Sequence, residues 1–230
     1  MLEQKLHSIT EVEDNNVKPP YSQTPCCMPL RVLNLYAGVG GNRELWENVE
    51  VTAVEYNENI AAEYKSKFQN DNVIVADAHE YLINNFENFD FVWASPPCPK
   101  HSRTNYFTQS ISKVRSYPDM KLWQEIIYLK HFCKSYWCVE NVIPYYEPFL
   151  PDYKKIGRHL IWSNFRISSI DMPKNEIGTM MKKYVGTGKH AHDKRQEDRN
   201  AVNPELGLHI LNCLRNVQSK RSNQLTLEGW

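Results

Sequence analysis

The sequence predicts an α/β protein with a mixed, mostly parallel sheet and helices on both faces. Five short apolar runs are typical of buried strands, and most of them stop at a glycine-rich turn, an acidic residue or a cysteine. Amphipathic helices are predicted over 119–133 and 204–217, where apolar residues recur at helical spacing. Because open α/β sheets bind ligands beyond the carboxyl ends of their strands, the functional site is expected at these ends.

Length and composition indicate one domain with small appendages, since 230 residues of 41% hydrophobic content suffice for a full core. No long apolar run and no secretory signal is evident, so a cytoplasmic protein without a membrane span is expected. The six cysteines form no paired clusters, so neither a metal site nor a disulfide framework is predicted. The balance of 27 basic and 27 acidic residues neither requires nor excludes nucleic acid.

The first three predicted strands end in residues suited to an adenosine compound. Residues 31–36 lead into the glycine-rich turn 37–41, which is expected to connect a strand to a helix and to let the backbone approach a ligand. The second strand, 51–56, brings Glu55 to its end, and the third, 72–76, is followed by Asp77. Two acids would repel a pyrophosphate and no phosphate-binding lysine motif is present, so S-adenosylmethionine is the favoured ligand.

The fourth strand, 91–94, presents Cys98 after a serine and two prolines that stiffen the turn. A free cysteine is on its own more often a small buried hydrophobe, which is the alternative for this residue. The fifth strand, 135–142, carries Glu140 and Asn141 to the same edge.

A polar linker, 99–118, follows Cys98 and contains basic residues but no acid. It is a candidate mobile loop that closes over a polyanion, and an ordinary solvated loop is the alternative. Its basic residues are Lys100, Arg103, Lys113 and Arg115.

These features, in this order, resemble the cytosine-C5 DNA methyltransferase family, which implies a Rossmann-like S-adenosylmethionine-dependent methyltransferase fold. The turn resembles the family's Phe-Ala-Gly-x-Gly-Gly motif, and residues 200–206 resemble the segment that returns to the catalytic domain. The resemblance implies cofactor-binding roles for Tyr36, Ala37, Gly38, Val39, Gly40, Gly41, Glu55, Tyr56, Asp77, Ala78, Pro97, Asn200 and Ala201.

The same resemblance implies a catalytic set of Cys98, Glu140, Asn141 and Arg158. Cys98 would attack cytosine C6, with its thiolate favoured by Lys100, Arg103 and the cationic methyl donor. Glu140 would bind the base edge, Asn141 would brace the strand end, and Arg158 would contact the cytosine O2 or the cysteine motif. Pro97 and Cys98, with Ser102 four positions further on, resemble the nucleophile motif, although Pro99 replaces the usual glutamine.

Only residues 166–199 separate the last catalytic strand from the returning segment, where the family usually holds a whole recognition domain. Arg199 also replaces the glycine before Asn200. We interpret 166–199 as a reduced target-recognition region, with a plain surface loop as the alternative. Together with Ser102 and the linker cations, the residues expected to bind nucleic acid are Lys182, Lys183, Lys189 and Arg195.

The predicted organisation is an arm (1–29), a catalytic core (30–165), the reduced recognition region (166–199), a returning segment and helix (200–217) and a flexible tail (218–230). Gln224 to Leu227 resemble a short peptide that docks on the replication sliding clamp, against the alternative of a frayed terminus.

The function implied is methylation of cytosine C5 in double-stranded DNA by a bacterial or phage enzyme, either solitary or part of a restriction-modification system. The alternatives are the same chemistry on RNA and a non-catalytic or partner-dependent DNA-binding relative. Adenine methylation is disfavoured, because that motif lacks a cysteine and this strand ends in Ser-Pro-Pro-Cys.

Overall fold

The computed structural model describes residues 28–103, 106, 117–172 and 201–227, with side chains placed as far as residue 220. Within these residues, seven strands form one sheet in the order β3-β2-β1-β4-β5-β7-β6. The strands are β1 (Leu30–Leu35), β2 (Val49–Glu55), β3 (Asn72–Val75), β4 (Phe91–Ala94), β5 (Tyr136–Val142), β6 (Tyr153–Ile156) and β7 (His159–Ser163). The pairs from β3 to β5 are parallel, whereas β7 is antiparallel to β5 and β6. The predicted mixed, mostly parallel α/β sheet is confirmed.

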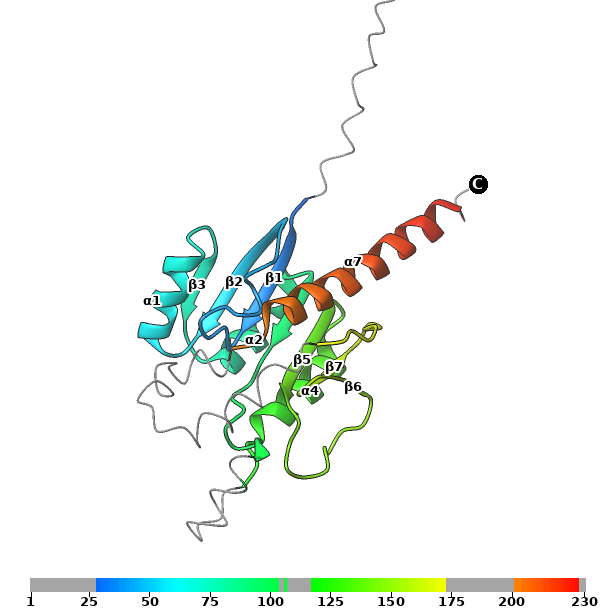
Figure 1. Ribbon diagram of the computed structural model, residues 1–230. Helices are drawn as coiled ribbons and strands as arrows, with labels where there is room; N and C mark the ends of the chain where they lie inside the picture. Colours follow the sequence, from blue (N-terminus) through cyan, green and yellow to red (C-terminus); the bar gives the residue numbers. More distant parts are fainter. Residues whose placement is uncertain (1–27, 104–105, 107–116, 173–200, 228–230) are drawn as a thin grey trace, which may run out of the picture.

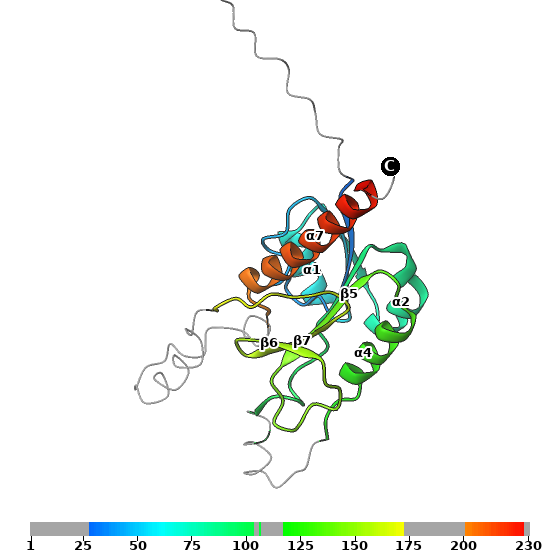
Figure 2. The same cartoon turned by 90° about the vertical axis from the view of Figure 1, so that its right-hand side faces the viewer.

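Helices cover both faces of this sheet (Figures 1 and 2). The helices are α1 (Glu58–Lys67), α2 (Ala78–Asn85), α4 (Lys121–Phe132) and α7 (Pro204–Leu227), with a short 3-10 turn, η1 (Phe86–Asn88). One core cluster joins α1 and α7 to the sheet, and a second joins α2 and α4 to the opposite face. No helix of the described chain is long and apolar enough to cross a membrane.

Strand β4 lies in the middle of the sheet and is buried on both sides. Phe91 and Trp93 face the α7 side, Val92 and Ala94 face the α4 side, and all four are 0% exposed. Burial on both faces explains why this strand is a continuous apolar run. It also places the segment after Ala94 at the centre of the carboxyl edge.

Three features differ from the predicted elements. The glycine-rich turn does not lead into a helix: successive turns follow, with hydrogen bonds of 3.0 Å from Gly40 N to Ala37 O and from Arg43 N to Gly40 O. Strand β6 was not predicted, because only one of its four residues is buried and it lacks an apolar pattern. Helix α7 continues to Leu227 instead of ending near Val217, because neither glycine nor proline interrupts residues 208–227.

Candidate active site

The loop after β4 carries Cys98 at the carboxyl edge of the sheet. The backbone N–H groups of His101 and Ser102 donate to the Cys98 carbonyl oxygen at 2.9 and 3.1 Å, which closes a tight turn. From β5, Asn141 Nδ2 donates to the Pro96 carbonyl oxygen at 2.8 Å. Asn141 is 1% exposed, so this buried hydrogen bond holds the loop against the end of β5.

The charges around Cys98 differ from those expected. Burial raises the pKa of the Cys98 thiol, and the negative charge of Glu140 raises it further. The positive charge of Arg158 acts in the opposite direction. Arg158 is therefore a side-chain cation that favours the thiolate, and the roles of Lys100 and Arg103 stay predictions.

Glu140 lies on β5 with only 4% of its surface exposed, and both of its carboxylate oxygens are engaged. Its Oε2 accepts a hydrogen bond from Ser95 Oγ at 2.9 Å, and Ser95 Oγ accepts one from Trp93 Nε1 at 2.8 Å. Its Oε1 pairs with His159 Nδ1. His159 was not among the predicted site residues; the one available signal was a histidine opening an otherwise apolar strand.

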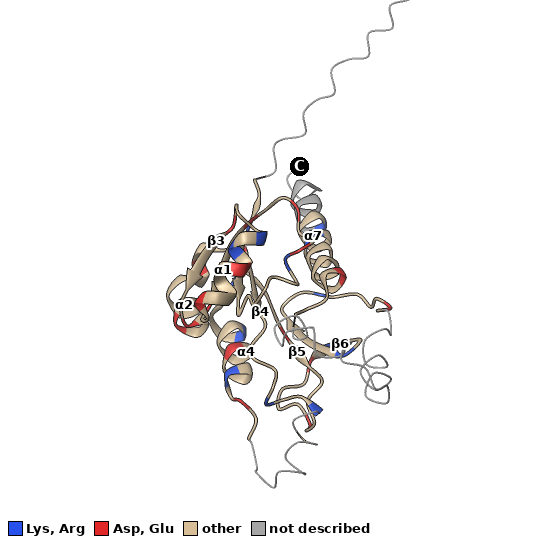
Figure 3. Cartoon of the chain, turned by 60° about the vertical axis from the view of Figure 1, so that its left-hand side comes forward, with Lys and Arg blue, Asp and Glu red and all other residues tan. Residues whose placement is uncertain are grey.

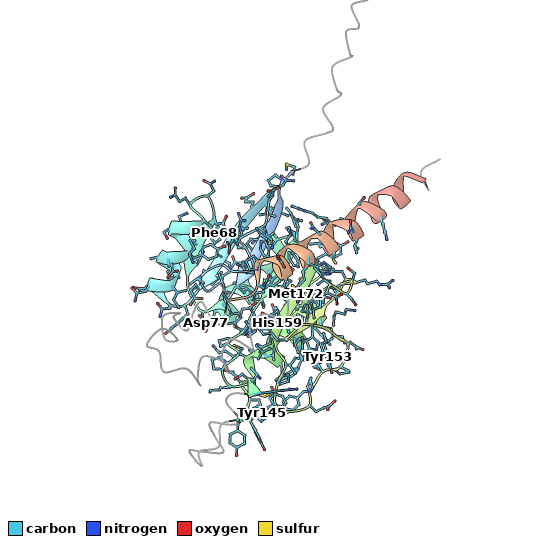
Figure 4. The ribbon with its side chains drawn as sticks, in the orientation of Figure 1. Phe68, Asp77, Tyr145, Tyr153, His159 and Met172 are labelled. Atoms are coloured by element: carbon cyan, nitrogen blue, oxygen red, sulfur yellow. The ribbon has the colours of Figure 1, made fainter. Side chains whose placement is uncertain are left out.

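The β6–β7 hairpin explains how His159 reaches Glu140. Gly157, with φ +55°, begins the two-residue turn between the strands, and Arg158 completes it. In the antiparallel register Val142 pairs with His159, so His159 is the diagonal neighbour of Glu140 on the same face. Arg158 Nε donates to His159 Nε2 at 3.2 Å. His159 is labelled near the middle of the view in Figure 4.

The glycine-rich turn leaves open space in front of the backbone. Tyr36, Gly38 and Gly40 all have positive φ values, of 55°, 55° and 82°. Gly38 N donates to Glu55 Oε2 at 3.0 Å, which ties the turn to the end of β2. A Cβ at Gly38 would meet no atom within 4 Å. A ligand is therefore able to approach this backbone closely.

The returning segment packs directly on the same turn. A Cβ at Gly41 would lie 2.4 Å from the Val202 carbonyl oxygen and 3.0 Å from Ala201 Cβ. A Cβ at Gly207, in α7, would lie 2.1 Å from the Asn42 carbonyl oxygen. Ala201 thus lies beside the turn, as its predicted role requires, whereas Asn200 is outside the described residues.

Glu55 at the end of β2 and Asp77 after β3 accept hydrogen bonds from nearby backbone N–H groups. Glu55 Oε1 accepts from Asn57 N at 3.0 Å, and its neighbour Tyr56 is 77% exposed. Asp77 caps α2 by accepting from His79 N at 2.9 Å, and it pairs with Lys121 at 3.2 Å. Burial alone would raise the pKa of Asp77, but the hydrogen bonds from backbone N–H groups and Lys121 outweigh it and lower the pKa.

A buried acid on α4, Glu125, was missed by the sequence analysis. It is 0% exposed, accepts from Tyr36 Oη at 2.5 Å, and lies 3.1 Å from His79 Nδ1. Burial raises the pKa of the Glu125 carboxyl, although both hydrogen bonds oppose this shift. The available signal was an acid between Leu122 and Ile126, on the apolar face of the predicted helix. Glu125 fastens the positive-φ residue Tyr36 to α2 and α4.

Residues expected to bind nucleic acid lie partly within the described chain. Arg103 lines a cavity beside the cysteine loop together with Tyr145, Tyr153 and Lys155. Ser102 forms an isolated bridge with Pro144 at the same place. Figure 3 shows acidic and basic residues interspersed along the chain. Lys113, Arg115, Lys182, Lys183, Lys189 and Arg195 lie outside the described residues.

Residues 30–143 match the family model for the C-5 cytosine-specific DNA methylase, and this part of the chain belongs to that family. The matched segment contains the glycine-rich turn, the acids after β2 and β3, the Cys98 loop and Glu140. The methyl donor that this family match implies is S-adenosylmethionine. A comparison with curated proteins found no match.

Solved structures with similar regions include a DNMT2 variant from Spodoptera frugiperda, at 24% identity and a TM-score of 0.36 over 49% of this chain and 35% of that one. Another is a putative prophage-encoded DNA modification methyltransferase from E. coli, at 20% identity and a TM-score of 0.34 over 51% of this chain and 33% of that one. The aligned region thus spans about a third of either relative's length.

The residues present fit the methyl donor. The open space at Gly38 allows close approach, the Glu55 carboxylate is bonded to Gly38 N, and the exposed Tyr56 follows Glu55 in the chain. The Asp77 carboxylate follows the neighbouring strand β3. Among the described residues, no group of three or more His, Cys, Asp or Glu side chains is arranged to hold a metal ion.

Proposed function

We propose that this protein methylates cytosine C5 in double-stranded DNA through a covalent bond between Cys98 and cytosine C6. The observation that carries the proposal is the pairing of a loop-borne thiol with a buried carboxylate. The charge of Glu140 acts on the Cys98 thiol, and Asn141, next to Glu140, is bonded to the Cys98 loop. This pairing stands at the same sheet edge as the glycine-rich turn.

The chemistry requires both groups, because cytosine C5 is too electron-poor to accept a methyl group unaided. Cys98 gives up its proton and the thiolate adds to C6, which makes C5 nucleophilic, while Glu140 accepts a hydrogen bond from N4 and shares the released proton with N3. The bound donor supplies the methyl group to C5. Loss of the C5 proton to a base then restores the ring, and the Cys98–C6 bond breaks.

The remaining roles follow the predicted sites. The methyl donor is held by the glycine-rich turn, the residues at the ends of β2 and β3, the start of the cysteine loop and the returning segment. These residues are Tyr36 to Gly41, Glu55, Tyr56, Asp77, Ala78, Pro97 and 200–201. Asn141 keeps the cysteine loop in place, and Arg158 balances charge near Cys98. The core of residues 30–165 is completed by 200–217, and 166–199 acts as a reduced recognition region.

A nucleic-acid substrate has to expose its base, since C5 and C6 lie inside the duplex stack. The cavity beside the cysteine loop favours such a substrate, because Arg103 and Lys155 suit phosphate and Tyr145 and Tyr153 suit base stacking. RNA stays an alternative, since this chemistry does not distinguish the polymers. Docking of Gln224 to Leu227 on the sliding clamp also stays a prediction; these residues end helix α7.

The test is covalent trapping with oligonucleotides that contain 5-fluorocytosine, because fluorine at C5 prevents the final elimination. Wild-type protein with the donor should form a stable adduct on duplex DNA, mapped to Cys98 by peptide mass spectrometry. Cys98→Ala should form none while keeping its donor affinity. Stronger trapping on RNA than on duplex DNA would favour the RNA alternative, and donor binding without any adduct would support the non-catalytic one.

A further inference from the structure

His159 makes contacts that the proposed chemistry leaves unused. It is 6% exposed and lies on the face of the sheet that α7 covers, beside Glu140. The groups placed against it are Glu140 on β5, Arg158 on the β6–β7 turn and, through Glu140, Cys98 on the loop after β4.

The hydrogen bonds of His159 define its tautomer. An arginine guanidinium only donates hydrogen bonds, so Nε2, which faces Arg158 Nε at 3.2 Å, has to be the acceptor. The ring proton is then on Nδ1, which points at Glu140 Oε1. Protonation at Nε2 would remove the acceptor of the Arg158 hydrogen bond. Arg158 therefore maintains His159 as a neutral donor to Glu140.

The direction of the Ser95 hydrogen bonds is defined in the same way. Trp93 Nε1 only donates, so Ser95 Oγ accepts from it at 2.8 Å and directs its own proton to Glu140 Oε2 at 2.9 Å. Each carboxylate oxygen has two acceptor positions. With one taken by Ser95 and one by His159, one position on each oxygen is left for the base.

We propose that His159 is a positioning residue that, with Ser95, fixes the Glu140 carboxyl group so that one free oxygen position accepts from N4 of the target cytosine and the other shares a proton with N3. This inference rests on the proposed function for its substrate. The hydrogen-bond network itself is a property of the free protein. A carboxylate held by two donors loses little rotational freedom when the base arrives.

Kinetics test the role of His159. His159→Leu should lower kcat on a cytosine-containing duplex about 100-fold, as expected when a reacting group is misplaced, with an unchanged KM for S-adenosylmethionine. His159→Asn should restore most of the rate, because its amide N–H stands where Nδ1 stood. His159→Gln should not, because its amide reaches the Nε2 position. Wild-type kcat in a folded His159→Leu protein would overturn the proposal, as would equal rates for the Asn and Gln variants.

A second measurement does not depend on turnover. In ¹⁵N-histidine-labelled wild-type protein, NMR should show His159 as the neutral Nδ1–H tautomer, with a strongly downfield proton that shifts in Glu140→Gln. An Nε2–H tautomer or an unaffected proton would overturn the proposal. The two experiments can give different answers. If NMR shows the expected tautomer but wild-type protein forms no adduct with 5-fluorocytosine, the proposed function is wrong and the hydrogen-bond network is still supported.

Discussion

In the free protein the negative charge of Glu140 disfavours the thiolate form of Cys98, because two negative charges at one site repel each other. Burial and the charge of Glu140 both raise the pKa of the Cys98 thiol, so most of the thiol keeps its proton. Only a thiolate reacts readily with oxidants and alkylating agents. In the proposed mechanism, Cys98 is thereby protected until a substrate binds at the Glu140 carboxylate.

A pH prediction follows from this opposition. Glu140→Gln removes one cause of the raised pKa, so the pKa of Cys98 falls and the thiolate fraction at a given pH rises. Alkylation of Cys98 by iodoacetamide at pH 8 should be faster by roughly twofold to tenfold, equivalent to at most about one pKa unit. Peptide mass spectrometry across a pH series measures this rate at Cys98 alone.

The matched control is Glu125→Gln, which removes a buried acid that does not act on Cys98. Its alkylation profile should follow that of the wild type. Superimposable profiles for wild type and Glu140→Gln would show that the carboxylate has no influence on the thiol.

At the scale of elements, two glycines of the glycine-rich turn are needed for different reasons. Gly38 faces open space, whereas Gly41 is pressed against the returning segment at Val202. Gly38 therefore leaves room for a ligand, whereas Gly41 allows distant parts of the chain to pack together.

We predict different outcomes for the two alanine variants. Gly41→Ala should lower the free energy of unfolding by about 1 to 3 kcal/mol, because its Cβ forces backbone apart. Gly38→Ala adds about 1 kcal/mol of backbone strain at a positive φ, but its main effect should be weaker binding of S-adenosylmethionine. Chemical denaturation and calorimetric titration measure the two effects. A Gly41→Ala protein as stable as the wild type would refute the packing role.

The strands that carry the site were predictable, because burial on both faces leaves apolar runs that end abruptly. Phe91 to Ala94 has these boundaries in the structure as well. Strand β6 was not predictable in this way, since three of its four residues are not buried. The same hairpin sets the register that brings His159 to Glu140, so their contact could not be read from the sequence.

At the scale of the whole molecule, helix α7 consists of two parts with different roles. Leu206, Ile210, Leu211 and Leu214 are all 0% exposed and complete the core on one face of the sheet. Val217 still packs against this core. The C-terminal part of the helix, red in Figure 1, extends past the sheet.

Truncation should separate these parts. A chain ending after residue 217 should keep its melting temperature within a few degrees and bind S-adenosylmethionine normally. Ile210→Ala, in the packed part, should lower the free energy of unfolding by about 2 to 5 kcal/mol, because it leaves a cavity in the core. Differential scanning calorimetry compares the two proteins. A large loss of stability in the truncated chain would show that the outer part of α7 is structural.

The parts of the site that follow strand ends were thus predictable, and those that need tertiary contacts were not. Asp77 could be placed because it lies in the short connection between β3 and α2. The links from Glu125 to Tyr36 and from Ser95 to Glu140 join residues 89 and 45 positions apart. Such pairings depend on how α4 and β5 pack against the first half of the chain.

The packing of α7 against β1 and β4 has a consequence for biosynthesis. Val32 and Trp93 emerge from the ribosome early, but the residues that cover them, Leu206 to Leu214, are translated more than a hundred codons later. Until then one side of the nascent sheet exposes apolar side chains. Chaperones recognise such surfaces. Translation has to pass Leu214 before this side of the sheet can be covered.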